Sequence, residues 1–403
     1  MSSLDAFRAR FPSLQRVHNG HPVAYFDGPG GTQVPRDVAD AMTDYLLNHN
    51  ANTEWAYPTS RETDEMIAAS RGALADFVNG SPGEIAFGNN MTTLTFHLSR
   101  AIARSWGPKD TIVVTQLDHH ANIDPWRAVA RDRGLRIETV RLDPETGELD
   151  PSSLERALNL RPKLVAIGAA SNALGTMPDV RTITAQAHDA GALAYVDAVH
   201  YAPHVLPDVK ALGCDFLACS AYKFYGPHVG VAWGRHELLD ALDVPKVAPA
   251  HDNAPDRVET GTLNHEGIIG AGAVVDFLAS FGQGSTRRER LASAYAEIHA
   301  RSAALFVTLW TALGEMRGVR RYGPPPSRRR SPTVSFTLDG ITPRSAAEQL
   351  AERGLFVSHG DFYAQTVAEV MNQKDGFIRV GLSAYSTGDE VDRLLERLRE
   401  LAG

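Results

Sequence analysis

Residues 193–200 read LAYVDAVH, a short apolar run followed at once by a carboxylate and then by a histidine. A run of this length without polar residues, here Leu193–Val196, is typical of a strand buried on both faces of a parallel sheet. Similar runs occur at Glu84–Gly88, Thr111–Thr115, Leu164–Ala169, Phe216–Ser220 and Val229–Trp233. Intervening segments such as Ser152–Asn159 and Asp179–Ala190 suit crossover helices. The alternation predicts an α/β domain with a mainly parallel sheet.

The pattern changes after about residue 285, where a long helix and a Pro-rich loop lead into a second unit. This unit should contain strand, helix, strand and helix at Thr333–Leu338, Pro343–Arg353, Phe377–Gly381 and Thr387–Ala402. Thr387 and Glu390 have the spacing of a capping box at the start of the last helix. A chain of 403 residues is too long for one core. We therefore expect an N-terminal segment (1–25) packed with the small domain, a large domain (26–285) and a small α+β domain (286–403).

Composition narrows the classes of partner. The net charge of −8 and a pI near 6.0 lack the basic excess that nucleic-acid binding needs. The run Arg328–Arg330 is interpreted as a solvated loop without function. The longest apolar stretch, Ile268–Phe281, is too short to span a bilayer and predicts a buried helix. The N-terminus lacks the features of a secretory signal, and Cys214 and Cys219 should be free thiols. We expect a cytoplasmic protein that binds neither nucleic acid nor membrane.

Lys223 follows the predicted strand Phe216–Cys219 in the segment SAYKFYGP (220–227). Taken alone, the segment favours a surface lysine with a solvated head group. Asp197, taken alone, suits a helix N-cap as well as any other role. About 26 residues separate the two, close to one strand-helix-strand unit, so the side chains could meet across neighbouring strand ends. A carboxylate in such a place can keep a pyridine nitrogen protonated.

Seven short motifs follow one another over nearly the whole chain. They are Tyr25–Gly28, Asp118–Asn122, Ser171–Thr176, Asp197–His200, Ser220–Pro227, Arg257–Thr262 and Arg379–Ser383. Any one would be a weak signal, but together the chain resembles the class V aminotransferase superfamily of fold-type I enzymes, and specifically its cysteine desulfurase-like branch. The resemblance implies pyridoxal 5′-phosphate (PLP) as cofactor, no metal, and a large domain whose mainly parallel sheet has seven strands.

The resemblance also implies roles for individual residues around the cofactor ring. Lys223 would form the Schiff base and Asp197 would pair with the pyridinium nitrogen. His119 would stack on the ring, although a hydrogen-bonded loop histidine is the alternative; a metal site is disfavoured because two adjacent histidines lack ligand spacing. Asn172 would donate to the phenolic oxygen, unless it is only a turn residue. His200 stands where many relatives have glutamine, which leaves its role open.

The phosphate should lie where Asn89–Thr93 opens a helix, because backbone N–H groups at a helix N-terminus bind anions. We assign the contacts to the Met91 and Thr92 amides and the Thr92 hydroxyl, with helix capping as the alternative for Thr92. Ser220 and Tyr222 match the family's serine and histidine phosphate contacts. Thr262 matches a residue that reaches the phosphate from a neighbouring subunit, which implies a homodimer with shared active sites.

The substrate side combines a match with a departure. Arg379 matches the arginine that holds the α-carboxylate of an amino-acid substrate, a role that its planar fork suits. Tyr363 stands where desulfurases carry the nucleophilic cysteine that takes up sulfur as a persulfide, and Ser358 stands where they often carry another arginine. Cys214 and Cys219 should be core residues that cannot replace the missing thiol.

The expected function is therefore that of a PLP-dependent enzyme acting on an amino acid through a Lys223 aldimine. The leading outcome is C–S lyase chemistry, a β-elimination without persulfide relay, because the nearest resemblance is to desulfurases. A class V aminotransferase is the alternative, an epimerase is another, and a PLP-binding regulator is the alternative outside enzymes. The substrate stays open.

Overall fold

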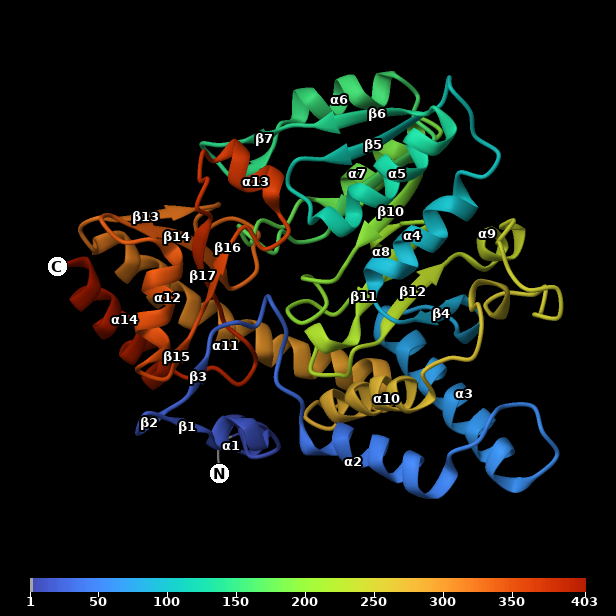
Figure 1. Ribbon diagram of the computed structural model, residues 1–403, viewed down its shortest axis with the longest axis horizontal. Helices are drawn as coiled ribbons and strands as arrows, with labels where there is room; N and C mark the ends of the chain where they lie inside the picture. Colours follow the sequence, from blue (N-terminus) through green and yellow to red (C-terminus); the bar gives the residue numbers. More distant parts are fainter. Residues whose placement is uncertain (1–2) are drawn as a thin grey trace.

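A computed structural model describes residues 3–403 (Figure 1). The large unit is built on a seven-stranded sheet with the order β4-β12-β11-β10-β9-β5-β6. Its strands are β4 (Ile85–Gly88), β5 (Thr111–Thr115), β6 (Arg136–Val140), β9 (Leu164–Gly168), β10 (Leu193–Asp197), β11 (Phe216–Ser220) and β12 (Gly230–Gly234). β12 is antiparallel to both of its neighbours, and all other pairs are parallel. The prediction of a mainly parallel seven-stranded sheet is confirmed.

Burial explains which strands the sequence pattern predicts. Every residue of β5, β9, β11 and β12 is buried, as their apolar composition requires. The strand β6 was not predicted, because it lies at the sheet edge and only Val140 of its five residues is buried. A partly solvated edge strand carries polar residues and so loses the apolar signal.

Helices cover both faces of this sheet (Figure 1). One core packs α4 (Met91–Ile102) and α5 (Asp124–Arg133) against the sheet, and the other packs α3 (Pro58–Val78), α6 (Pro151–Asn159), α7 (Val180–Asp189) and α10 (His265–Ala279). The prediction of a buried helix at residues 268–281 is confirmed by α10, of which twelve of fifteen residues are buried. Among the described residues, no helix is both long and apolar enough to cross a membrane.

The small unit follows the helix α11 (Arg287–Glu315). Its antiparallel sheet has the order β13-β14-β17-β16, formed by Val319–Tyr322, Thr333–Leu338, Phe377–Gly381 and Ser358–Gly360. The helices α12 (Pro343–Ala351) and α14 (Gly388–Ala402) pack on it, and the Thr387–Glu390 capping box is present. β14 and β17 have the predicted bounds. The short strands β13 and β16 were not predicted.

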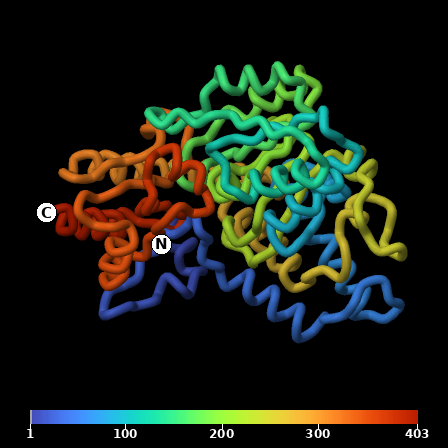
Figure 2. Tube along the Cα trace, turned by 45° about the horizontal axis from the view of Figure 1, so that its top comes forward, coloured from blue at the N-terminus to red at the C-terminus, as the bar shows by residue number. Residues whose placement is uncertain are grey.

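The N-terminal segment touches both units. β3 (Ala24–Tyr25) pairs in parallel with β15 (Leu355–Phe356) of the small unit. Phe7, at the end of α1 (Ser3–Arg8), packs against Phe277 of the large unit. Figure 2 shows this blue segment beside the red end of the chain. The chain then passes Lys223, whose Nζ donates to the carbonyl oxygens of Pro29 and Gly30. The N-terminal segment therefore forms part of the site. The domain boundaries at residues 25 and 285 stay a prediction.

The remaining elements are short. They include α2 (Arg36–Asp44), α8 (Val209–Leu212), α9 (His236–Ala241), α13 (Gln365–Val370), and the two-residue strands β1 (Val17–His18), β2 (His21–Pro22), β7 (Leu142–Asp143) and β8 (Glu148–Leu149). One sequence interpretation is wrong in part. Arg330 is not solvated: it is 9% exposed, its guanidinium lies over the rings of Phe306 and Trp310, and it donates to the Leu174 carbonyl.

Candidate active site

Lys223 lies in a 3-10 turn directly after β11, at the carboxyl edge of the sheet. Its Nζ donates to the carbonyl oxygens of Pro29 (2.6 Å) and Gly30 (3.0 Å). The solvated surface lysine that its segment alone favours is therefore not what the structure shows. Burial lowers the Lys223 pKa to about 7, and the positive charge of Arg379 contributes to this shift. The negative charge of Asp197 acts in the opposite direction and raises the Lys223 pKa. A large fraction of this amine is neutral, and hence nucleophilic, near neutral pH.

Asp197 ends the neighbouring strand β10, in register with Ala218 of β11. The side chain is 7% exposed, and its Oδ1 accepts from the Val199 N–H (2.8 Å). No helix starts there, so the N-cap alternative is wrong. Burial raises the Asp197 pKa to about 7, an effect that Asp118 increases and Lys223 opposes. A cationic ring nitrogen beside this carboxylate would stabilise its charged form.

His119 follows β5 and is held in one tautomer. Its Nδ1 accepts from the Ala121 N–H (2.9 Å), which leaves the proton on Nε2. Burial, and then the Lys223 charge, lowers the His119 pKa to about 3, so the ring is neutral. The ring stacks with that of Tyr363, with centroids 5.6 Å apart and planes 28° apart. A neutral, oriented imidazole suits stacking on an aromatic cofactor.

Arg379 and Asn172 form one hydrogen-bonded group beneath the loop that carries Tyr363. Arg379 donates from Nη1 to the Asn172 carbonyl (3.0 Å) and from Nη2 to the Ser358 hydroxyl (3.3 Å). Its guanidinium lies over the Phe362 ring at 3.8 Å, and burial lowers its pKa to about 9. The Asn172 amide donates to the Phe362 carbonyl (2.9 Å). Among the described residues, Arg379 Nε and Asn172 Oδ1 are buried without a partner.

Two of the expected phosphate contacts, Met91 and Ser220, meet at the N-terminus of α4. The Met91 N–H donates to the Ser220 hydroxyl (3.0 Å), so these two residues from different segments lie together. The N-cap of α4 is Asn90, which accepts from the Thr93 N–H, so the capping alternative for Thr92 is wrong. The Tyr222 ring stacks on His228, with centroids 4.7 Å apart, and lies 4.9 Å from Lys223 Nζ. A helix N-terminus with nearby hydroxyls is suited to a dianion.

His200 and Thr262 complete the set of predicted cofactor-binding residues. His200 is 3% exposed, and its Nε2 faces the hydroxyls of Ser331 (3.0 Å) and Thr333 (3.1 Å) from the small unit. Its pKa lies well below the ordinary value because of burial, so the ring is neutral. Thr262 is exposed, in a cavity that Asn89 and Thr93 also line, and its role across a subunit boundary stays a prediction.

Sequence reasoning gave no role to two acidic residues of the site. Asp27 lies near Arg379 and Lys223, and burial raises its pKa. Its Oδ1 is buried and has no hydrogen-bond partner in the part of the chain that the structure describes. Asp118 is 3% exposed and accepts from Thr115 Oγ1 (2.8 Å), Asn122 Nδ2 (2.7 Å) and the Gly168 N–H (3.0 Å). These bonds join the ends of β5 and β9 beside His119. Both residues lie within the family motifs, which were the available signal.

The site fits PLP on the chemistry of its donors. Buried polar side-chain atoms normally have partners, yet four without one within residues 3–403 belong to this site or its wall: Asp27 Oδ1, Asn172 Oδ1, His200 Nδ1 and Arg379 Nε. PLP would be held by Lys223 at its aldehyde, by Asp197 at its ring nitrogen and by the α4 N-terminus at its phosphate. Arg379 then remains for a substrate carboxylate.

Similarity to known proteins agrees with this site. Residues 24–394 match the class-V aminotransferase family. The chain is 31% identical to a probable cysteine desulfurase of Streptomyces coelicolor over 98% of this chain and 96% of the relative. It is also 31% identical to a cysteine desulfurase of Dickeya dadantii, over 99% of this chain and 98% of that one.

Two solved structures have the same fold. A cysteine desulfurase from Thermococcus onnurineus superposes with a TM-score of 0.90 at 29% identity, covering 100% of this chain and 98% of the other. A cysteine desulfurase from Escherichia coli superposes with a TM-score of 0.84 at 26% identity, covering 99% and 98%. The chain therefore belongs to the class-V aminotransferase family, in its cysteine desulfurase-like branch, and is a PLP-dependent enzyme.

Proposed function

We propose that this enzyme cleaves the Cβ–S bond of a cysteine-type amino acid by β-elimination and does not relay the sulfur as a persulfide. The observation that carries the proposal is the chemistry of the loop at Tyr363. This side chain is 76% exposed and stacks on His119, at the position where the resemblance predicts a nucleophilic cysteine. A phenol is a poor sulfur acceptor at neutral pH.

Neither cysteine of the chain can take its place. Cys214 and Cys219 are 1% and 0% exposed, and burial raises the pKa of each thiol to about 12. The thiolate is the nucleophile in sulfur transfer, and almost none forms at neutral pH on such a residue. Cys219 lies inside β11, which cannot swing towards a substrate or an acceptor protein.

The side chains suit the steps of an elimination. Arg379 would bind the substrate carboxylate through its guanidinium fork. PLP, when bound, withdraws electrons from the substrate Cα and so acidifies its proton. Lys223 Nζ, neutral in part near pH 7, would accept that proton. Asp197 would pair with the ring nitrogen, whose positive charge would stabilise the ionised carboxylate. The Cα–H and Cβ–S bonds break, the electron pair of the Cα–H bond forms a Cα=Cβ bond, and the sulfur leaves with the Cβ–S pair as sulfide or thiolate. One water then hydrolyses the enamine product to pyruvate and ammonia.

Product analysis tests this function. With cysteine as substrate, we expect pyruvate, ammonia and sulfide in equal amounts. Alanine with sulfur transferred to an acceptor thiol would instead show desulfurase activity and contradict the proposal. Amino transfer that depends on a keto acid would show an aminotransferase, loss of optical rotation an epimerase, and absence of turnover with any amino acid a regulator.

Replacing Cys214 by alanine and Cys219 by serine in one variant should leave turnover of the folded enzyme within about twofold of wild type. A hydroxyl in the buried strand should cost about 1–3 kcal/mol of stability, so the folded fraction must be measured alongside. Mass spectrometry of the wild-type enzyme after incubation with cysteine should find neither thiol persulfidated. A persulfide on either cysteine that passes to an acceptor would restore desulfurase as the function.

We also propose a cytoplasmic homodimer in which Thr262 of one subunit contacts the phosphate of the other. Exposed apolar side chains support a second copy as the partner. Four of them occur within residues 46–57: Leu46 (47% exposed), Leu47 (77%), Trp55 (60%) and Tyr57 (47%). Two buried cysteines without a disulfide fit a reducing compartment.

Replacing Trp55 by glutamate should weaken the dimer by about 30-fold or more, because a buried interface tryptophan is typically worth 2 kcal/mol or more. Analytical ultracentrifugation should then show a larger fraction of monomers than for the wild-type protein, and these monomers should retain less PLP after dialysis. Leu160, 55% exposed at the end of α6, provides the control: Leu160→Glu should stay dimeric. A monomeric sample that keeps both PLP and activity would exclude the role of Thr262.

A further inference from the structure

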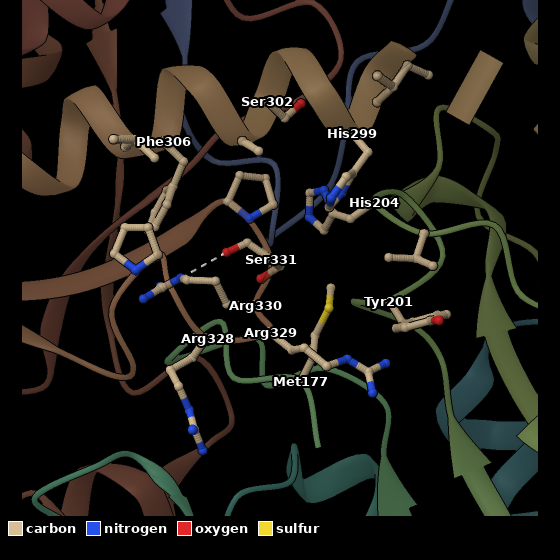
Figure 3. A pocket seen from close by; sticks show the side chains of 16 residues that line it. Met177, Tyr201, His204, His299, Ser302, Phe306, Arg328, Arg329, Arg330 and Ser331 are labelled. Atoms are coloured by element: carbon tan, nitrogen blue, oxygen red, sulfur yellow. Dashed lines mark hydrogen bonds between the residues drawn. The ribbon is translucent and has the colours of Figure 1, made fainter. Parts of the chain in front are cut away.

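A second cavity, of about 290 Å³, lies apart from Lys223 (Figure 3). Its walls are α11, the segment that follows β10, and the loop that leads into β14. Much of the lining is apolar and includes Met177, Val205, Ile298, Phe306 and Val307. An apolar cavity of about 150 Å³ accommodates benzene, so this one has room for a ring with a polar substituent.

One polar side chain of the cavity points to a ligand. His204 is 7% exposed and lines the cavity, and its Nε2 is buried with no hydrogen bond within the described chain. Figure 3 shows the ring of His204 beside that of His299 at one end of the cavity. Burial lowers the His204 pKa to about 3, so the ring is neutral and offers one donor and one acceptor. Buried polar atoms of this kind normally have a partner.

Of the three arginines among the described residues of the cavity lining, Arg329 has the weakest pairing. Arg328 is paired with both carboxylate oxygens of Glu148 (2.9 and 2.7 Å), and Arg330 is turned onto the Phe306 ring. Arg329 is 64% exposed and has only a 3.6 Å contact with Asp179. No aspartate or glutamate is among the residues that line the cavity. An apolar lining, a neutral imidazole and the weakly paired guanidinium of Arg329 together match a small organic acid.

We propose that this cavity is an effector site that binds a small monocarboxylate with an apolar body, its carboxylate paired with Arg329. The apolar body packs among Ile298, Phe306 and Val307, and His204 Nε2 supplies a hydrogen bond. This site does not depend on the function proposed above.

The cavity also touches the wall of the active site. Ser331 lines it, and the Ser331 hydroxyl lies 3.0 Å from His200 Nε2. The rings of His200 and His204 meet edge to face, with centroids 5.1 Å apart. Burial is the main cause of the lowered His200 pKa, and the positive charges of Arg379 and Lys223 lower this pKa further. A ligand bound to His204 would therefore act on His200, which the His204 ring contacts and which we predict to lie at the PLP site. This contact is the reason for proposing an effector site.

Binding of benzoate to the holoenzyme, measured by calorimetry and ligand-detected NMR, tests the site. We expect saturable binding at one site per chain, and binding of benzyl alcohol, the neutral analogue, about tenfold weaker. Arg329→Gln should weaken benzoate binding by a similar factor. Ala303→Phe, at an exposed position of the lining, should block the cavity and remove binding without disturbing the core. The control Arg131→Gln, on an arginine 80% exposed on α5, should leave binding unchanged.

Hydrogen–deuterium exchange provides the second readout. Benzoate should slow exchange in residues 198–206 and 324–332 of the wild-type enzyme and not of folded Ala303→Phe. Benzoate binding that survives both Ala303→Phe and Arg329→Gln would place the ligand at Arg379 and overturn the proposal. Equal affinity for benzyl alcohol would refute the carboxylate assignment, and binding without slower exchange at residues 198–206 would refute the link to His200.

Discussion

Replacing Lys223 by alanine should abolish turnover, with a loss of more than about 10⁴-fold, because one side chain both anchors the cofactor and moves the α-proton. The structure gives the reason. The amine lies at the end of β11, is held by the carbonyls of Pro29 and Gly30, and has a pKa lowered to about 7. No other described lysine lies with Asp197 and Arg379 in this way, so no neighbour can replace it.

Borohydride reduction makes the same prediction chemically. In the wild-type enzyme, peptide mapping after reduction should find the cofactor on the peptide that contains Lys223. The control is Lys163→Ala, on a lysine 49% exposed directly before β9, which should keep activity, the yellow colour and the reduced adduct. An adduct on any other lysine, or full activity of folded Lys223→Ala, would contradict the assignment.

The fold could be predicted well from the sequence where burial is complete. Strands such as β5, β9 and β11 are apolar because both of their faces are covered, and their predicted bounds agree with the structure within one residue. β6 was missed because its edge position permits polar residues, and β16 because it has only three residues. The apolar pattern of a segment indicates how deeply that segment is buried, and the edge strands of a sheet show this pattern less clearly.

The site was predictable only in part, for a related reason. Asp197 and Lys223 could be found because each follows a predicted strand and each lies in a motif of the family that the chain resembles; the two strands are neighbours. Their partners come from distant segments: the carbonyls of Pro29 and Gly30 lie 194 and 193 residues from Lys223, and Ser331 lies 131 residues from His200. These contacts depend on how the N-terminal segment and the small unit pack, which no strand or helix pattern specifies.

The buried arginine shows the same limit. The run 328–330 has the composition of a solvated loop, and Arg328 and Arg329 are exposed as expected. Arg330 is buried because Phe306 and Trp310 of α11 offer aromatic faces and Leu174 offers a carbonyl. Cation–π contact and hydrogen bonds together offset the loss of hydration. Neither the rings nor the carbonyl is near in sequence, so composition alone favoured the wrong surroundings.

Asp197→Asn should lower turnover by about 10²–10³-fold while leaving the fold intact, because it removes a charge from a preorganised site without changing the shape of the side chain. The carboxylate is 7% exposed, and its Oδ1 accepts from the Val199 N–H, a bond that an amide oxygen can retain. The charge cannot be retained. A neutral amide next to the ring nitrogen no longer favours its protonated form, so the Cα proton becomes less acidic.

In the cofactor-free enzyme, Asp197→Asn should raise the melting temperature, whereas in the holoenzyme it lowers turnover. In the folded chain without PLP, burial raises the Asp197 pKa from 3.8 to about 7, so the folded state binds its proton more tightly than the unfolded state does. Stability is then lost as the pH rises from about 4 to 7, because ionisation of the folded state is unfavourable. Asparagine does not ionise, so cofactor-free Asp197→Asn should melt at a higher temperature than cofactor-free wild type at pH 8, and the gap should close towards pH 4.

The two measurements together separate a role at the ring nitrogen from a structural role. A carboxylate that only supported the fold would, on replacement, lower the melting temperature of the cofactor-free enzyme together with the activity. If the carboxylate pairs with a cationic nitrogen, its replacement should stabilise the cofactor-free protein and still lower activity and PLP affinity.

Asp215 offers a matched control, since it is 2% exposed and paired with His188 and Arg235. Asp215→Asn should lower the melting temperature with and without PLP, because it breaks the ion pair with Arg235. If Asp197→Asn behaved like Asp215→Asn, the assignment of Asp197 to the ring nitrogen would be wrong.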